Sequence, residues 1–119
     1  MRLSAEPISA RVARSFVVRT LDAWGHPELA DTAELLTSEL VTNVVRHGHT
    51  DMLLALHGDD DRVVVEVADE SADDVRPREP DAEDVSGRGL YLVASMAQRW
   101  GVDRRTPGKS VWFELVPSH

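Results

Sequence analysis

The sequence predicts an α+β fold, a two-layer α/β sandwich in which helices cover one face of a mixed, mostly antiparallel sheet. Two observations support this prediction. Apolar residues recur with a helical period through residues 9–47, whereas residues 51–58, 62–69 and 109–116 are Val- and Leu-rich runs typical of strands. The order of helix, helix, hairpin, loop, helix and hairpin, in a chain of 119 residues, is expected to form one domain, 1–119.

Two helices are expected before the first strand. The first spans residues 9–24, with Ser9 available as the N-cap and Gly25 as the terminator. Pro27 then opens a longer helix over residues 28–47, which agrees with the preference for proline at helix starts. Each helix has apolar side chains three and four residues apart, so each is expected to bury one face.

Two hairpins and a third helix are expected in the rest of the chain. Residues 51–58 and 62–69 would form the first hairpin, around an Asp-rich turn. Helical spacing returns over residues 87–100. Residues 101–105 and 109–116 would form the closing hairpin, joined by a Thr-Pro-Gly turn.

A long acidic segment separates the first hairpin from the third helix. Residues 70–87 contain seven acidic side chains and two prolines, and almost nothing that a core could bury. A loop of this length in so small a domain is usually functional or disordered.

The composition argues against several classes of function. A net charge of −8 disfavours nucleic acid as a direct partner, because binding a phosphate backbone requires a basic surface. No apolar run could span a membrane and no signal-peptide core is visible, so a cytoplasmic protein with no membrane partner is expected. Without cysteine, a metal ion would need oxygen or imidazole ligands. Lys109 is the only lysine, so any role that requires a lysine falls on it.

Three polar side chains interrupt the apolar second helix. Glu39, Asn43 and His47 are spaced four apart and therefore lie in a line beside the buried face. One interpretation is a helix boundary, where such side chains are solvated or paired. However, Asn is unfavourable inside a helix, its amide oxygen suits Mg²⁺, and a carboxylate one turn away can accept a proton. Glu39 and Asn43 are therefore candidates for a magnesium–phosphate site with a general base, whereas His47 more often meets the helix dipole.

Two other positions allow both a functional and a structural interpretation. Asp69 ends a predicted strand, where it could accept a hydrogen bond from a ligand amino group or simply start a turn. Gly87 and Gly89 flank the expected start of the third helix, with Arg88 between them. Such a site favours an anion, because the first N–H groups of a helix are free, but the glycines could equally form a hinge.

Four motifs, taken in order, resemble one family over nearly the whole chain. ELVTNVVRH (39–47) resembles the N-box of the Bergerat, or GHKL-type, ATP-binding fold of gyrase and histidine kinases, and VEVAD (65–69) resembles the box that follows. GRGLYLV (87–93) is similar to the glycine box after the ATP lid, and GKSVWFEL (108–115) to the closing strand. A single short domain of this kind is most similar to the bacterial anti-sigma factor serine/threonine kinases.

This resemblance implies a role for each matching residue. Glu39 would be the catalytic base, Asn43 would bind Mg²⁺, and Asp69 would accept a hydrogen bond from the adenine amino group of ATP. Residues 70–86 would be the ATP lid, and a long loop is expected there because a lid must close over the nucleotide and open again. Three residues at the hinge of the lid and one near the adenine complete the implied nucleotide site: Gly87, Arg88 and Gly89, and Ser110.

The resemblance also implies partners. The protein would be an Mg-ATP-dependent serine/threonine kinase that phosphorylates an anti-sigma factor antagonist protein. Once that antagonist is released, the kinase would sequester a sigma factor. It would act as a homodimer, with the region of the first helix as a partner and dimer surface.

Two alternatives stay open. The family's box is usually D-x-G-x-G, whereas this chain reads DESAD, with Ser71 and Asp73 in place of both glycines. A backbone that approaches a base closely or adopts a positive φ favours glycine, so one alternative is an anti-sigma or adaptor module that binds proteins stoichiometrically without catalysis. The other is a generic α/β domain whose polar stripe is accidental. That alternative predicts no rise in melting temperature with Mg-ATP.

Overall fold

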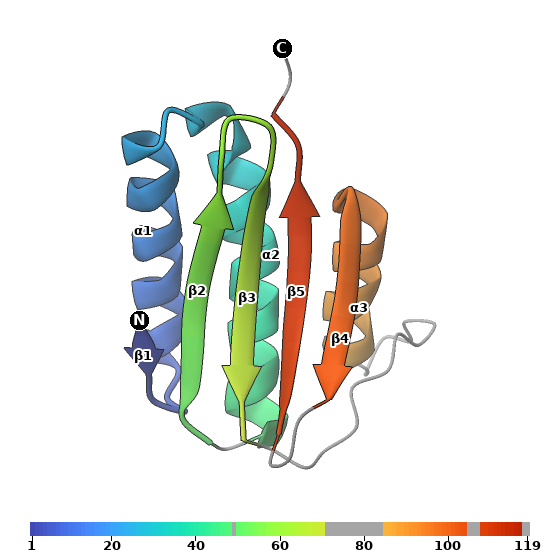
Figure 1. The fold of residues 1–119 in the computed structure, drawn as a ribbon. Coiled ribbons are helices and arrows are strands. Elements are labelled where there is room, and N and C mark those ends of the chain that lie inside the picture. Colours follow the sequence, from blue (N-terminus) through green and yellow to red (C-terminus); the bar gives the residue numbers. More distant parts are fainter. Residues whose placement is uncertain (49, 71–84, 105–107, 118–119) are drawn as a thin grey trace.

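A computed structural model of the protein describes residues 1–48, 50–70, 85–104 and 108–117. Three helices cover one face of a five-stranded sheet (Figure 1), which confirms the predicted α+β sandwich. Within these described ranges, no helix is long and apolar enough to cross a membrane.

The sheet consists of strands that all pair antiparallel, in the order β1-β2-β3-β5-β4. The strands are β1 (Arg2–Leu3), β2 (Met52–Gly58), β3 (Val63–Asp69), β4 (Arg99–Arg104) and β5 (Lys109–Leu115). The sheet was expected to be mostly antiparallel, and among the described strands every pairing is antiparallel. Strands β3 and β4 do run in the same direction, but β5 inserts between them and opposes both (Figure 1). Strand β1 was not predicted, because two residues are too few to show a period.

The helices are α1 (Ile8–Ala23), α2 (Ala30–Asn43) and α3 (Val85–Met96). A 3₁₀ turn (Pro27–Leu29) precedes α2 and a π-helical turn (Val44–Gly48) follows it. The predicted second helix, residues 28–47, is thus divided into three pieces with different backbone geometry. Helix α2 packs between α1 and α3, against the sheet (Figure 1).

Two helix boundaries differ from the sequence-based expectation. Ser9 is not the N-cap of α1, because Pro7 occupies that position and Ser9 Oγ donates a hydrogen bond to the carbonyl of Ser4 at 2.7 Å. The third helix ends at Met96 rather than at residue 100. The backbone N–H of Gln98 already bonds to the carbonyl of Glu114, at 2.8 Å, so the chain joins the sheet there.

The core lies between the helices and the sheet. Every second residue of β3 is buried, and this row ends at Asp69, which therefore faces the helices. Phe113 of β5 lies opposite Val65 and is fully buried. The buried face of α2 supplies the matching apolar side chains, among them Leu36 and Leu40. The alternation of the strands thus determines which polar residues at their ends turn toward α2.

The turn between β2 and β3 should make stability depend on pH. The Asp59 carboxylate accepts hydrogen bonds from the backbone N–H groups of Asp61 (2.8 Å) and Arg62 (3.0 Å), and these bonds lower the pKa of Asp59. A lowered pKa means that the folded state favours the ionised form, so the turn stabilises the protein above the ordinary pKa of an aspartate. This stabilisation is lost as the pH falls through the folded value. Asp59→Ala should therefore lower the denaturant midpoint at neutral pH, with no difference from the wild type in strong acid.

Asp60→Ala is the matched control for this measurement. Asp60 is exposed in the same turn and takes no part in the two bonds to Asp59. Equal losses of stability at neutral pH for the two variants, or a difference that persists in acid, would contradict the role given to Asp59.

Candidate functional site

Four elements have their ends at the same end of the sandwich. Helix α2 and strand β3 both end there, and strand β5 and helix α3 both begin there (Figure 1). Neighbouring elements in this antiparallel arrangement alternate in direction, so residues far apart in sequence meet at one end. Asn43, Asp69, Lys109 and Gly87 belong to these four element ends.

Glu39 and Asn43 lie on the flank of α2 that faces away from α1. On the other flank, Ser38 accepts a hydrogen bond from Arg14 of α1, at 3.1 Å. A residue five positions further along an α-helix lies about 140° around its axis, so Asn43 lies on the flank opposite Ser38. Helix α3 packs against α2 on the side away from α1 (Figure 1). Glu39, one turn before Asn43, shares that flank. Both side chains are half-buried.

The amide oxygen of Asn43 is buried and has no hydrogen-bond partner in the part of the chain that the structure describes. Leaving a buried acceptor unsatisfied costs roughly 1–3 kcal/mol, so a partner from outside this set of residues is expected. Asn43 is also the last residue of α2 before the π-helical turn. Such turns are frequent at functional sites. Both features fit an oxygen that binds a ligand.

Asp69 is paired with the only lysine of the chain. Lys109 lies opposite Asp69 in the register of β3 and β5, and its Nζ is 3.3 Å from Asp69 Oδ1. Only 2% of the Asp69 side chain and 6% of the Lys109 side chain are exposed. Burying a charged carboxylate costs free energy unless the carboxylate is paired, and the Lys109 ammonium group offsets this cost for Asp69.

Ser110 lies on the other face of the sheet. It pairs with Ala68, and adjacent residues of a strand point to opposite faces. The structure therefore does not bring Ser110 beside Asp69, and Lys109 takes that place. The Ser110 hydroxyl is buried without a partner among the described residues, so its role as a nucleotide contact stays a prediction. Motif comparison cannot show which of two adjacent residues faces the helices, because a shift of one residue exchanges the faces.

Gly108 positions the start of β5 against the end of β3. Its φ is 94°, and a Cβ atom there would overlap the carbonyl oxygen of Asp69 and lie 2.7 Å from the Cα of Glu70. Only glycine fits both the backbone conformation and this close approach. The Thr-Pro-Gly motif indicated the turn, but the contact with Asp69 could not be read from it.

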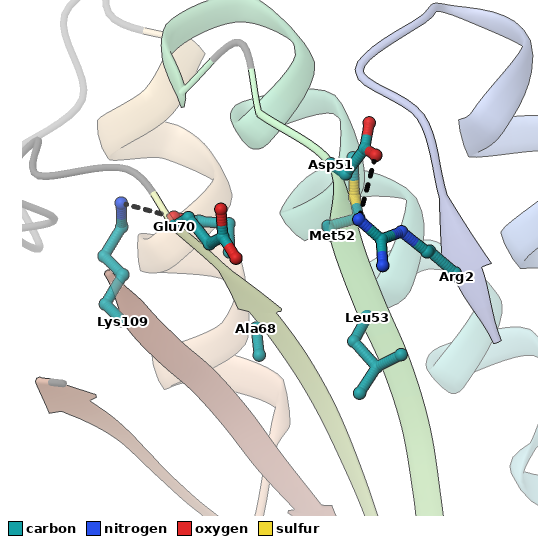
Figure 2. A pocket seen from close by; sticks show the side chains of 8 residues that line it. Arg2, Asp51, Met52, Leu53, Ala68, Glu70 and Lys109 are labelled. Carbon is teal, nitrogen blue, oxygen red and sulfur yellow. Dashed lines mark hydrogen bonds and ion pairs between the residues drawn. The ribbon is translucent and has the colours of Figure 1, made fainter. Parts of the chain in front are cut away.

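A cavity of about 280 Å³ lies beside the ion pair (Figure 2). Asp69 and Lys109 line one side, and Arg2 and Asp51, 3.3 Å apart, line another. Small-molecule pockets usually measure about 300–1,000 Å³, so this cavity has room for a group the size of a base rather than for a whole nucleotide. Glu39 and Asn43 do not line this cavity.

Comparison with protein families gives an independent result. The sequence model of the histidine kinase-like ATPase domain matches residues 3–115. This protein belongs to that family. The match runs from β1 to the last residue of β5, so the whole sandwich is a histidine kinase-like ATPase domain, and membership indicates that it binds ATP. A comparison with curated proteins finds no match.

A magnesium ion in this histidine kinase-like ATPase domain would have few protein ligands. No group of three or more His, Cys, Asp and Glu side chains that could hold a metal occurs among the described residues. Magnesium usually keeps several waters and is bound by one or two protein oxygens together with substrate phosphates. The unpaired amide oxygen of Asn43 fits this mode of binding.

The predicted ATP lid, residues 70–86, lies mostly outside the described residues, and so do both departures from the family's glycine pattern, Ser71 and Asp73. Helix α3 of this ATPase domain begins at Val85, two residues before the expected start. The glycines therefore do not flank the helix start: Gly87 and Arg88 lie in the first turn and Gly89 in the second. Glycine is tolerated in a first turn, because the N–H groups there have no intrahelical acceptor. Those N–H groups still suit an anion, and the roles of the three residues stay predictions.

Proposed function

We propose that this protein is a serine/threonine protein kinase that uses Mg-ATP. The main supporting observation is the amide oxygen of Asn43, which is buried without a described partner one helical turn after Glu39. An oxygen ligand for Mg²⁺ and a nearby carboxylate are the groups that phosphoryl transfer to a hydroxyl requires from the protein. Membership of an ATPase domain family supports ATP as the nucleotide.

The proposed mechanism depends mainly on positioning and charge neutralisation. When bound, Mg-ATP supplies the phosphoryl group and the cation that balances its charge. Asn43 would hold the cation through Oδ1, and Asp69 would orient the base by accepting a hydrogen bond from its amino group. Glu39 would take the proton of the attacking Ser or Thr hydroxyl. The hydroxyl oxygen would form a bond to the γ-phosphorus while the bond between that phosphorus and the bridging β-phosphate oxygen breaks.

We also propose that the hydroxyl belongs to an anti-sigma factor antagonist protein. Its phosphorylation would release the antagonist and leave the kinase, as a homodimer, free to sequester a sigma factor. These partners are supported by the resemblance of the four motifs and the small size of the domain. Helix α1 exposes the apolar side chains of Ile8 (53%) and Val12 (38%), which supports an interaction surface there.

A second candidate is an adaptor of the same fold that binds its partners without transferring phosphate. One observation favours it: Lys109 already engages the carboxylate of Asp69 that would accept the hydrogen bond from adenine. Ser71 and Asp73, in place of the family's glycines, favour it as well.

Incubation with radiolabelled ATP and candidate antagonist proteins tests the two candidates. Label on the partner protein is the expected result, and its disappearance with Glu39→Ala would assign the activity to this site. Tight partner binding without any transfer of label would instead support the adaptor.

Asn43→Ala should abolish the stabilisation of the protein by Mg-ATP. For a ligand at about 100 times its Kd, binding adds about 2.7 kcal/mol to stability, which a thermal-shift measurement detects. Because the Asn43 oxygen has no described partner within the protein, the variant without nucleotide should melt at or slightly above the wild-type temperature. Thr42→Ala, at the adjacent half-buried position, should keep the full response. An unchanged Mg-ATP response in Asn43→Ala would remove Asn43 from the site.

A further inference from the structure

We infer that Lys109 determines base specificity by donating a hydrogen bond to a purine ring nitrogen, next to the amino group that Asp69 accepts. This inference rests on the proposed function, because it requires a nucleotide at Asp69. It adds a contact that the motif comparison did not identify.

The position of Lys109 is unusual for a lysine. Lysines are almost never fully buried unless they are paired, yet only 6% of this side chain is exposed. Gly108 holds the preceding backbone against Asp69 and Glu70, so the side chain starts from a well-defined point. The only acceptor that the described residues offer to its ammonium group is Asp69, at 3.3 Å. An ammonium group has three donors, so two of its N–H groups have no acceptor among the residues that the structure describes.

The ion pair presents an acceptor and a donor side by side. An ionised carboxylate has about four lone-pair sites, so Asp69 can accept from Lys109 and from a ligand at the same time. In adenine the amino group, a donor, lies between two acceptors, the ring nitrogens N1 and N7. A carboxylate alone would satisfy the amino group and leave the neighbouring ring nitrogen without a donor. The pair of Asp69 and Lys109 matches both groups.

The space beside the pair is suitable for such a ligand. The cavity of about 280 Å³ touches both Asp69 and Lys109, and apolar side chains, among them Met52 and Leu53, also line it. Three further charged residues, Arg2, Asp51 and Glu70, line the cavity as well. Leu53 and Ala68 are paired on the sheet face opposite the Asp69 side chain, so the cavity reaches the ion pair at the ends of the strands. Its volume suffices for a purine base whose polar edge meets Asp69 and Lys109.

A pair with only a structural role would show the same contacts, so the test must change the ligand. We would measure the binding of ATP, 1-deaza-ATP and 7-deaza-ATP, each with Mg²⁺, to the wild type, Lys109→Met and Lys109→Arg. Each analogue lacks one of the two ring nitrogens, so only the analogue without the nitrogen that Lys109 contacts should lose a hydrogen bond. The wild type should bind that analogue roughly tenfold or more weakly than ATP, because the lost bond is to a charged group. Lys109→Met should bind that analogue and ATP about equally. Lys109→Arg, which keeps the charge and the donors, should retain the discrimination.

Three results would overturn the inference while leaving nucleotide binding in place. These results are equal binding of ATP and both analogues by the wild type, discrimination that persists in Lys109→Met, and tighter binding of ATP by Lys109→Met because Lys109 competes for Asp69. The comparison of analogues on the wild type stays decisive even if Lys109→Met does not fold. A wild type that shows no response to Mg-ATP at all would overturn both this inference and the proposed function.

Discussion

Replacing Glu39 by glutamine is expected to slow phosphoryl transfer to a partner protein by about 10²–10⁴-fold, the usual contribution of a general base. Glutamine has nearly the same shape as glutamate but cannot take the proton of the attacking hydroxyl. Glu39 is half-buried on the flank of α2 that also holds Asn43, so the isosteric change should not disturb packing. Binding of Mg-ATP should therefore be retained. The measurement is single-turnover transfer of label from ATP, together with a thermal shift.

Glu34→Gln is the control for this experiment. Glu34 is another half-buried acid of α2, but it lies one turn before Ser38, on the flank that faces α1. It should transfer phosphate at the wild-type rate. If Glu39→Gln transferred phosphate as fast as Glu34→Gln, Glu39 could not be the base, and another carboxylate would have to be sought.

Replacing Gly108 by alanine is expected to have the largest effect on folding, about 2–5 kcal/mol of lost stability. Two costs combine at this position. A side chain is strained at a φ of 94°, and the added Cβ would overlap the carbonyl oxygen of Asp69. Relief of that overlap must move the start of β5 away from the end of β3, and Lys109 moves with it. The response to Mg-ATP should fall together with the denaturant midpoint.

Gly25→Ala separates these two costs. Gly25 also has a positive φ, 80°, but a Cβ there would meet nothing within 4 Å. This variant should lose only the conformational part, about 1–2 kcal/mol, and should respond normally to Mg-ATP. Equal destabilisation by the two substitutions would show that the close contact with Asp69 has no energetic weight.

Several features of this protein could be predicted from the sequence because they depend on residues close together in the chain. The β2–β3 hairpin was expected within one residue of its observed bounds, since alternation along a strand is a local pattern. The shared flank of Glu39 and Asn43 was equally local, because residues four apart in a helix face the same way in any fold. The composition excluded a site built on cysteine, because the chain has none. The order of the expected helices and strands predicted the two-layer architecture.

Other features required the tertiary structure, because they depend on contacts between distant parts of the chain. The insertion of β5 between β3 and β4 made the whole sheet antiparallel, and its register put Lys109 rather than Ser110 beside Asp69. The need for glycine at position 108 comes from the backbone of β3, which is about forty residues away along the chain. The sequence by itself provided the candidate side chains for a nucleotide site. Strand register and helix packing decided which of them meet, since a shift of one residue in a strand reverses the direction of every side chain.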